Sequence, residues 1–292
     1  MRKSYINGDT VEGISQRLRY FFQCLINHQI GDSKAIKLLQ PSLIIKDLDI
    51  SNLSPSRALC NSFWKTLDYT KLEIALESKL HFCDLGCGDG KYGNFFKNWT
   101  GQSFGSYTGI DIYKNDKFPD EFEHKLSKAE SAHEHINGNV NVIVSQSALE
   151  HIENDIEVLE SLTRKLIKKN KNFIQIHLVP ASASLWLYLF HGWRQYSKKN
   201  LGFLAKKIKK VDGLEVSAVA LGGKLSFWIH LRHITFPYVL NKLQRRENRQ
   251  YKSKNISQII LSKIDQELNC NGKIPSFWAL IIHKKDHEIG FK

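Results

Sequence analysis

The stretch "HFCDLGCGDGKYG" (residues 81–93) decides the fold of this chain. A short apolar run leads into a loop in which Gly86, Gly88 and Gly90 alternate with other residues, and a helix is predicted over residues 91–99. Glycines at such a turn permit positive φ angles and let a ligand approach the backbone closely. The loop lacks the G-x-x-x-x-G-K-[ST] pattern of a phosphate-binding loop, and its G-x-G-x-G spacing differs from the dinucleotide fingerprint. Strand, loop and helix together predict a Rossmann-like unit.

Short apolar runs that indicate strands recur along the chain. They cover residues 80–85, 107–113, 122–129, 140–146, 172–179, 214–221 and 276–285. Amphipathic helices are predicted over residues 11–30, 54–78 and 153–170. This alternation predicts an α/β fold: a doubly wound, mostly parallel, seven-stranded sheet. The last strand, which no helix follows, is expected to be antiparallel and at the edge of the sheet.

The same pattern divides the chain into two units. Residues 1–79 are expected to form an N-terminal helical extension, and residues 80–292 the α/β domain. Two stretches interrupt the alternation in that domain: residues 181–210, which hold an aromatic segment, and residues 224–270, a helical insertion before the last strand. Insertions of this kind commonly shape the substrate pocket of α/β enzymes.

Composition limits the class of protein. The 292 residues are 42% hydrophobic, enough for a proper core. The longest apolar run, residues 183–190, is too short to span a bilayer. A signal peptide would need an apolar region after its basic start, and the sequence has none there. The five cysteines lack paired spacing and are expected to be free thiols. A cytoplasmic protein, or one peripheral to the inner face of the membrane, is expected.

The net charge of +13 suits an anionic partner. The basic runs at residues 164–172, 206–210 and 242–254 all lie in the second half of the chain. Such a charge fits three kinds of partner: nucleic acid, a membrane surface or an acidic glycan. The alternative is that the lysines only form a solvated face and bind no partner.

An acidic residue after the second predicted strand points to a nucleoside. Asp111 lies where a carboxylate binds ribose hydroxyls in Rossmann-like sites. With "DLGCGDG" (84–90), "GIDIY" (109–113) and "SALEHIEND" (147–155) in this order, the chain resembles the class I S-adenosylmethionine (SAM)-dependent methyltransferases over residues 80–180. The resemblance implies the Rossmann-like methyltransferase fold, methyl transfer and SAM as cofactor. By position it implies a cofactor-binding set: Asp84, Gly86, Cys87 and Gly88 at the methionine end, Asp111 at the ribose, Ile112 at the adenine, and Ser145 and Gln146 along the cofactor.

Candidate catalytic residues lie at the ends of the fourth and fifth strands of the expected domain. A hydroxyl acceptor benefits from a base that removes its proton, and a neutral imidazole can do so at pH 7. The candidates are Glu150, His151, His177 and His191. A helix-end or core role is the alternative for each histidine.

A metal stays open. Quinone and small-RNA methyltransferases resemble the "SALEHIEND" stretch as E-x-x-E-H and bind Mg²⁺ through it. Here Ser147 stands in place of the first glutamate, and one carboxylate with one histidine makes a poor Mg²⁺ site unless other ligands join.

The acceptor is expected at the aromatic segment "SLWLYLFHGWRQYS" (184–197). Trp193 and Tyr196 offer rings on which sugars stack, and Arg194 can grip a carboxylate or phosphate. The wider segment 177–197 and the helix at 54–67 resemble bacterial methyltransferases encoded with surface-polysaccharide genes. This resemblance implies O-methylation of a sugar hydroxyl on a surface polysaccharide or its lipid-linked precursor.

Other functions stay open on the sequence. An RNA or tRNA methyltransferase fits the charge, although no separate RNA-binding module is visible. A quinone or natural-product O-methyltransferase and a non-catalytic methyltransferase-like binding protein are further alternatives. The methylated position, the oligomeric state and the histidine that serves as base are not determined by the sequence.

Overall fold

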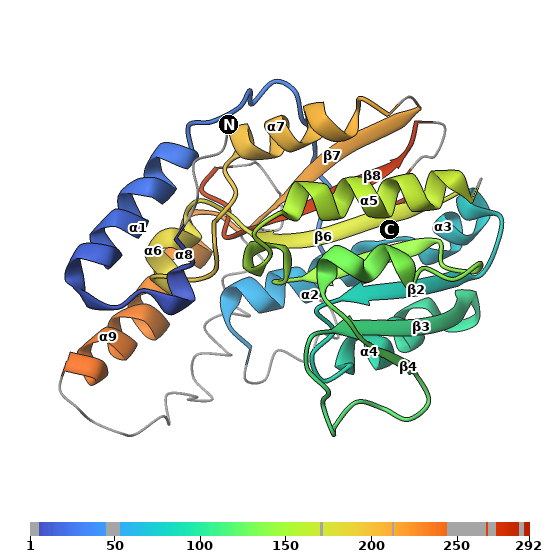
Figure 1. Cartoon of the computed structure of the whole chain (residues 1–292), viewed down its shortest axis with the longest axis horizontal. Coiled ribbons are helices and arrows are strands. Elements are labelled where there is room, and N and C mark those ends of the chain that lie inside the picture. Colours follow the sequence, from blue (N-terminus) through green and yellow to red (C-terminus); the bar gives the residue numbers. More distant parts are fainter. Residues whose placement is uncertain are drawn as a thin grey trace.

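The computed structural model describes residues 6–44, 53–169, 172–211, 213–243, 267, 273–285 and 289–292. Within these residues eight strands form one sheet in the order β1-β7-β8-β6-β5-β2-β3-β4 (Figure 1). The strands are β1 (Lys37–Leu39), β2 (Leu80–Leu85), β3 (Phe104–Asp111), β4 (Glu123–Leu126), β5 (Val142–Gln146), β6 (Ile174–Pro180), β7 (Leu214–Leu221) and β8 (Phe277–Lys284). The pairs are parallel except those of β8, so the predicted mostly parallel α/β sheet is confirmed.

Two strands differ from the prediction. β8 is antiparallel as expected, but it lies between β6 and β7 and not at an edge. Its side chains are buried along nearly the whole strand, and the backbone of such a strand is satisfied by neighbours on both sides. The edge position belongs to β1, an eighth strand inside the region predicted to be helical, which pairs with Ser217–Val219 of β7. Three residues are too few for a periodic signal, so the sequence did not reveal this strand.

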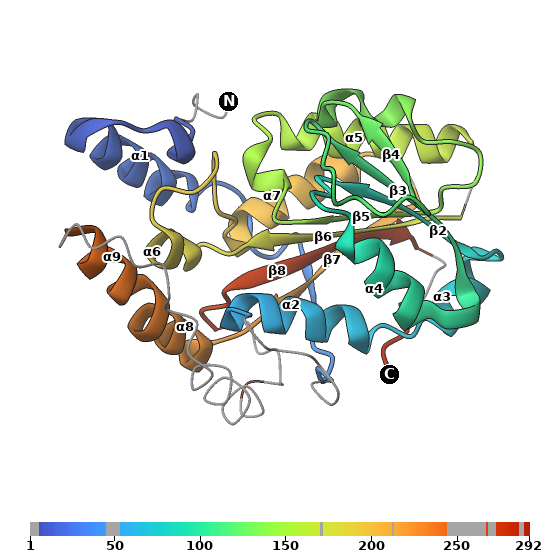
Figure 2. The ribbon, with the colours of Figure 1, turned by 90° about the horizontal axis from the view of Figure 1, so that it is seen from below.

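Helices cover both faces of the sheet (Figure 2). They are α1 (Gly13–Asn27), α2 (Pro55–Thr66), α3 (Tyr69–Leu76), α4 (Lys91–Thr100), α5 (Asp155–Lys168), α6 (Ser184–Tyr188), α7 (Lys198–Ile208), α8 (Lys224–His230) and α9 (Phe236–Leu243). Side chains of α2, α3 and α4 share one buried cluster with alternate residues of the strands, and α5 and α7 share the other. Phe82 and Cys83 show the alternation, since each belongs to a different cluster.

The region predicted as one helix over residues 54–78 forms two. Ser54 caps α2 by accepting the Arg57 N–H (3.2 Å), and Pro55 occupies the first turn. Leu67 then adopts an extended conformation, and the Asp68 side chain caps α3. The break lets both helices lie against the sheet.

The two stretches that interrupt the strand–helix alternation are partly described. Residues 181–210 contain α6 and α7, and α7 is a crossover helix whose apolar side chains pack on the sheet. Residues 224–243 form α8, a π-helical turn η5 (Leu231–Thr235) and α9, whereas the rest of the predicted insertion, apart from Glu267, lies outside the described residues. None of the helices in the described ranges is long and apolar enough to cross a membrane.

Candidate functional site

The glycine loop follows β2 through three left-handed backbone conformations. Gly86, Gly88 and Gly90 have φ angles of 70°, 57° and 68°, which glycine adopts without the steric cost of a Cβ. The Gly86 N–H donates to the carbonyl of Ile110 on β3 (2.8 Å), so the loop is fixed to the carboxyl edge of the sheet. A Cβ on Gly88 would meet no atom within 4 Å. The loop therefore faces open space in which a ligand can approach its backbone.

Asp111 ends β3 beside this loop. One carboxylate oxygen accepts from the N–H of Gly88 (2.9 Å) and the other from the N–H of Tyr113 (3.1 Å). The side chain of Ile112 is 54% exposed next to it. The two hydrogen bonds hold a half-buried carboxylate at the rim of the open space, where it can accept hydrogen bonds from ribose hydroxyls.

Asp84 and Cys87 are buried at the base of the loop. Burial raises the pKa of Asp84 to about 7, although the hydrogen bond that Tyr107 donates to its Oδ2 (2.6 Å) opposes the rise. Burial also raises the pKa of the Cys87 thiol. A cationic group bound here would favour the ionised form of Asp84, whereas the buried thiol is a weak nucleophile.

The end of β5 is linked to both the loop and α2. The Oε1 of Gln146 accepts from the indole N–H of Trp64 (2.8 Å). Farther along, a Cβ on Gly86 would lie 2.6 Å from the Cβ of Ala148. The loop after β5 thus packs directly against the glycine loop and brings the residues that follow to the edge of the same open space.

His177 lies away from this edge. Its imidazole is fully buried, and its Nδ1 lies 2.9 Å from the hydroxyl of Ser145. Burial lowers the pKa of His177 to about 3. Its neighbour Gln175 donates to Thr163 of α5 (2.7 Å), which marks this as the face of the sheet that α5 covers. His177 and Ser145 therefore form a neutral pair within the core in this structure.

The other three candidate catalytic residues come together, and an unpredicted one joins them. Glu150 and His151 lie in the single 3₁₀ turn η4 (Leu149–His151), and His191 follows α6. Asp9, from the N-terminal segment, lies 2.8 Å from His151 (Oδ2 to Nδ1) and 3.6 Å from His191 (Oδ1 to Nδ1). The Nε2 of His191 lies 3.8 Å from Glu150 Oε1. We call these four residues the Asp–His cluster.

The backbone of the loop 189–193, which carries His191 into this cluster, is strained. Leu189 and Phe190 have positive φ angles of 39° and 61°, which non-glycine residues rarely adopt. A Cβ on Gly192 would lie 2.6 Å from the carbonyl oxygen of Glu150, and that carbonyl accepts from the N–H of Trp193 (2.7 Å). Glycine is thus required where the loop passes over η4.

Charge is concentrated in the cluster. The Glu150 side chain is fully buried, and neither carboxylate oxygen has a hydrogen-bond partner among the described residues. The interaction with Glu150 raises the pKa of His191, and burial opposes it. A protonated His191 between Glu150 and Asp9 would offset one of their two negative charges.

Two of the predicted acceptor-binding residues make intramolecular contacts. The Arg194 guanidinium pairs with Asp155 (3.0 Å) and donates to the carbonyls of Ile152 and Glu153 (2.7 and 2.5 Å). Tyr196 donates to the same Asp155 (2.7 Å). Both are at most 3% exposed, so they hold the start of α5. Trp193 is half-buried beside the cluster.

The surroundings are completed by Asp9 and Arg57, which the sequence patterns do not single out, and by Tyr188 of the predicted aromatic segment. Arg57 donates to the hydroxyl of Tyr92 (3.4 Å), which lies in the first turn after the glycine loop. Tyr188 contacts the His191 ring with centroids 5.9 Å apart, and burial raises its pKa to about 12. Asp9 lies in a segment with no recognisable motif. Arg57 lies in the segment 54–67, whose resemblance to polysaccharide methyltransferases singles out no individual residue.

A cavity of about 580 Å³ adjoins the cluster. Asp9 forms part of its wall, and the remaining lining is apolar or aromatic apart from one cation: Gly8, Val11, Arg17, Tyr188, Leu189, Phe190, Tyr238 and Val239. Arg17 lies over the Phe190 ring at 5.5 Å. The cavity thus lies between α1 and α9, with the Asp–His cluster at one wall.

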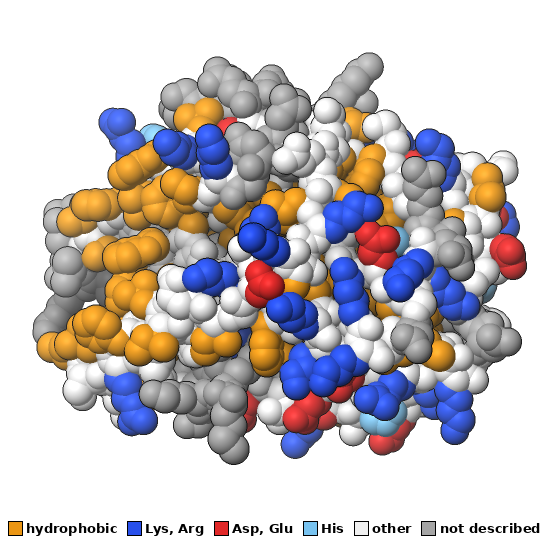
Figure 3. Space-filling view, turned by 90° about the horizontal axis from the view of Figure 1, so that it is seen from above, with side chains coloured by type: hydrophobic (Ala, Val, Ile, Leu, Met, Phe, Trp, Pro, Cys, Tyr) orange, Lys and Arg blue, Asp and Glu red, His pale blue; other side chains and the backbone are white. Residues whose placement is uncertain are grey.

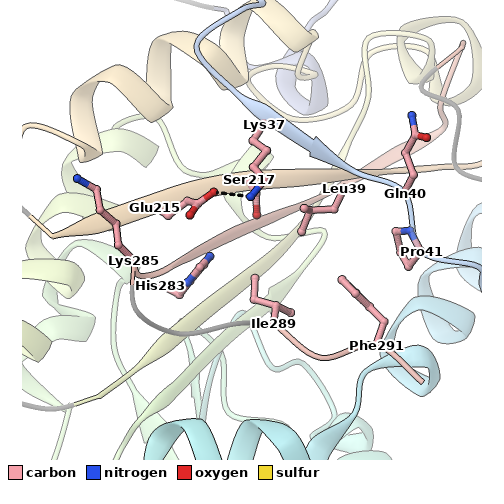
Figure 4. A pocket seen from close by; sticks show the side chains of 10 residues that line it. All are labelled: Lys37, Leu39, Gln40, Pro41, Glu215, Ser217, His283, Lys285, Ile289 and Phe291. Atoms are coloured by element: carbon pink, nitrogen blue, oxygen red, sulfur yellow. Dashed lines mark ion pairs between the residues drawn. The ribbon is translucent and has the colours of Figure 1, made fainter.

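A second cavity, of about 460 Å³, shares no residue with the predicted site (Figure 4). It lies against β1, β7 and β8, and an ion pair between Lys37 and Glu215 (3.1 Å) crosses its wall. His283, Lys285 and Phe291 also line it. It borders the amino end of β7, whereas the glycine loop follows the carboxyl end of β2.

The cluster also has the composition of a metal site. Within the described residues, Asp9, His151 and His191 offer ligand atoms within 4.8 Å of one another. Imidazole and carboxylate ligands suit divalent transition metals. The direct contact between Asp9 and His151 fills the space between those two ligands, so a metal ion would have to replace it.

Comparison with known proteins agrees with this geometry. A family model described as a methyltransferase domain matches residues 63–210, just over half of the 292 residues. No curated protein matches the chain. Among solved structures, the plantazolicin methyltransferase BamL, in complex with a triazolic desmethylPZN analogue and SAH, is 16% identical, with 80% of this chain and 86% of that chain covered and a TM-score of 0.51. A SAM-dependent methyltransferase from Archaeoglobus fulgidus is 14% identical over 80% of this chain and 96% of that chain, with a TM-score of 0.44.

At these identities the structural likeness to BamL supports the fold alone. The family match goes further, because it covers both the glycine loop and the turn that carries Glu150 and His151. The predicted enzyme class is confirmed, and the chain belongs to the methyltransferase-domain family as a SAM-dependent methyltransferase.

Proposed function

We propose that this methyltransferase transfers the methyl group of SAM to a sugar hydroxyl of a glycan. The glycan would be a surface polysaccharide or its lipid-linked precursor. The observation that carries the proposal is the Asp9–His151 pair. Asp9 lines a cavity, and His151 follows the loop that packs on Gly86. A hydroxyl, unlike an amine, needs a base of this kind to lose its proton.

The glycine loop and its neighbours fit the donor. When bound, SAM supplies a methyl group on a positively charged sulfur. Asp111 would accept hydrogen bonds from the ribose hydroxyls, and Ile112 would flank the adenine. Asp84 and the guanidinium of Arg57 would hold the ammonium and carboxylate groups of the methionine part. The open space over Gly88 supports this fit.

His151 is our candidate for the base. Its Nδ1 contacts Asp9, which would fix the tautomer that keeps Nε2 unprotonated and able to accept a proton. Among the described residues, no hydrogen bond or ion pair involves Nε2. The acceptor hydroxyl would give its proton to His151 as its oxygen bonds to the methyl carbon and the bond between that carbon and the sulfur breaks, with the electron pair left on sulfur. Asp9 would stabilise the imidazolium, and Glu150 with His191 would keep the local charge balanced.

The cavity between α1 and α9 is our candidate for the acceptor site. Tyr188, Phe190 and Tyr238 provide rings on which a sugar can stack, and Arg17 provides a cation for a carboxylate or phosphate. The net charge of +13 fits an acidic or phosphate-bearing acceptor. Trp193 stays a candidate acceptor contact beside the cluster, whereas Arg194 and Tyr196 have other partners.

The proposal is tested by transfer of labelled methyl groups from SAM into separated cell fractions: glycolipid and polysaccharide, RNA, and small molecules. We expect label in the glycolipid or polysaccharide fraction, and we expect His151→Ala to abolish it. His133→Ala, which changes a half-buried histidine in another 3₁₀ turn, is the matched control. Label in RNA, or in quinones and other small molecules, would overturn the glycan assignment.

The same assay decides between a base and a metal. Because His151 and Asp9 contact each other directly, we expect EDTA to leave the transfer rate unchanged. Loss of activity in EDTA that Mn²⁺ or Zn²⁺ restores would instead assign the cluster to a metal ion.

A further inference from the structure

One end of the molecule exposes an unusual number of apolar side chains. Of the fifteen large hydrophobic side chains that are exposed among the described residues, ten belong to four helices at this end, α1, α6, α8 and α9 (Figure 1). They are Ile14, Leu18, Phe22, Leu25, Ile26, Trp186, Trp228, Phe236, Tyr238 and Leu240. We call this surface the apolar end. A patch of this kind marks an interaction site.

α1 shows the pattern most clearly. Its buried contacts are limited to Tyr20, Cys24 and Asn27, whereas Leu18 and Ile26 are 53% and 59% exposed. The exposed apolar residues of α1 lie three, four or eight positions apart in the sequence, so they form a stripe along the helix. A helix that presents such a stripe to water needs a partner outside the described part of the chain.

The segments that form the apolar end contain few acids, although the Glu267 carboxylate accepts from backbone N–H groups at the start of α8. Residues 11–30 contain a single acid, Glu12, and residues 182–200 and 224–243 contain none. Arg19 on α1, Lys224 on α8 and Arg232 in η5 are exposed among the apolar side chains. Figure 3 shows the hydrophobic side chains gathered at its left, with blue side chains of Lys and Arg beside them.

We propose that the apolar end docks on an anionic lipid membrane. Apolar side chains would enter the boundary of the acyl chains while the cations contact lipid phosphates, as an interfacial amphipathic helix does. A second copy of this chain is a poorer occupant, because it would bring the same cations against Arg19 and Arg232. A carboxylate-rich protein could neutralise those cations, but ten apolar side chains need an apolar partner as well.

The cavity of the Asp–His cluster supports this occupant. It lies between α1 and α9, and both Tyr238 and Arg17 belong to its lining. A membrane against the apolar end would therefore place lipid headgroups beside the entrance to this cavity. Resting on the proposed function, docking would select a lipid-linked glycan over a free one.

The direct test is flotation of the purified chain with vesicles of phosphatidylcholine, with and without phosphatidylglycerol. We expect binding to the anionic vesicles that weakens with salt. The double variant Leu18→Glu/Ile26→Glu should lower binding at least about tenfold, because charges replace two exposed apolar side chains that would enter the membrane. Arg19→Glu/Arg232→Glu should lower it by a similar factor on anionic vesicles.

Ile74→Glu is the matched control, because Ile74 is 70% exposed on α3 at a distance from the apolar end. We expect it to float like the wild-type chain, and circular dichroism should show the same helix content in all variants. Absence of vesicle binding, or equal loss in the control, would overturn the proposal. So would a dimer in light scattering that Leu18→Glu/Ile26→Glu dissociates.

Flotation needs neither SAM nor an acceptor, so its failure is separable from that of the proposed function. Vesicle binding without methyl transfer to glycolipid would leave the docking surface standing and refute the acceptor. Methyl transfer to glycolipids in detergent without vesicle binding would support the acceptor and refute the docking surface.

Discussion

The proposed donor side and the proposed acceptor side of this enzyme are built in different ways. The proposed donor side comes from one continuous stretch: the glycine loop follows β2, Asp111 ends β3 and Gln146 ends β5, and β3 and β5 are the two neighbours of β2 in the sheet. The acceptor side brings together Asp9, His151, His191 and α9, which are far apart in the sequence. The first is a local consequence of parallel strands whose carboxyl ends meet. The second depends on long-range packing by the N-terminal segment and the loop after α6.

This difference predicts that the two sides fail separately. Changes in the Asp–His cluster should remove methyl transfer and spare SAM binding. Changes beside the glycine loop should weaken SAM binding directly.

The largest effect is expected from His151→Ala. Loss of a general base commonly lowers a rate by about 100-fold or more. The affinity for SAM, measured by isothermal titration calorimetry, should stay within about twofold of wild type, since His151 is proposed to contact only the acceptor. His133→Ala should change neither quantity. A His151→Ala enzyme that retains its rate would remove His151 from the mechanism.

Asp111→Ala should weaken SAM binding by about 10- to 100-fold, because the carboxylate that we propose accepts hydrogen bonds from the ribose is lost. The variant also frees the N–H groups of Gly88 and Tyr113. Asp116→Ala, an exposed carboxylate on the same loop, serves as control. Equal thermal shifts with SAM in the two variants would argue against the ribose assignment.

The pH dependence of SAM binding probes Asp84, whose pKa burial raises to about 7. Only the ionised form attracts an ammonium group, so the affinity should fall about tenfold between pH 8 and pH 6. The folded chain binds this proton more tightly than the unfolded chain. The contribution of Asp84 to stability is therefore lost as the pH rises toward 7. Asp84→Asn should flatten the binding profile, and an unchanged slope in that variant would assign the titration to another group.

The smallest effect is expected from Glu150→Gln. Glu150 raises the pKa of His191, so the substitution should lower that pKa, as measured by NMR titration. A raised histidine pKa stabilises the fold fully below its unfolded value and loses that contribution as the pH rises through the folded value. The pH dependence of unfolding by urea should therefore become weaker in Glu150→Gln. A His191 pKa that does not move would show that the two side chains are uncoupled.

The same division explains what the sequence could predict. The glycine loop, Asp111 and the positions of most strands along the chain follow from local patterns. The predicted α/β sheet is confirmed. The interior position of β8 and the short β1 depend on pairing between distant segments, which no local period encodes. Residue type and proximity to strand ends predict three of the cluster's members as candidate catalytic residues: Glu150, His151 and His191. Asp9, which joins them, could be found only once the chain was folded.

Asp9→Asn tests the central claim most directly, because Asp9 belongs to the acceptor side alone. The measurement compares the SAM dissociation constant and the rate of methyl transfer in this variant with those of wild type. An unchanged dissociation constant with a rate lowered at least about tenfold is the predicted result, since the neutral amide no longer stabilises the His151 imidazolium. A rate equal to that of wild type, or a loss of SAM affinity that accounts for the whole decrease, would contradict it.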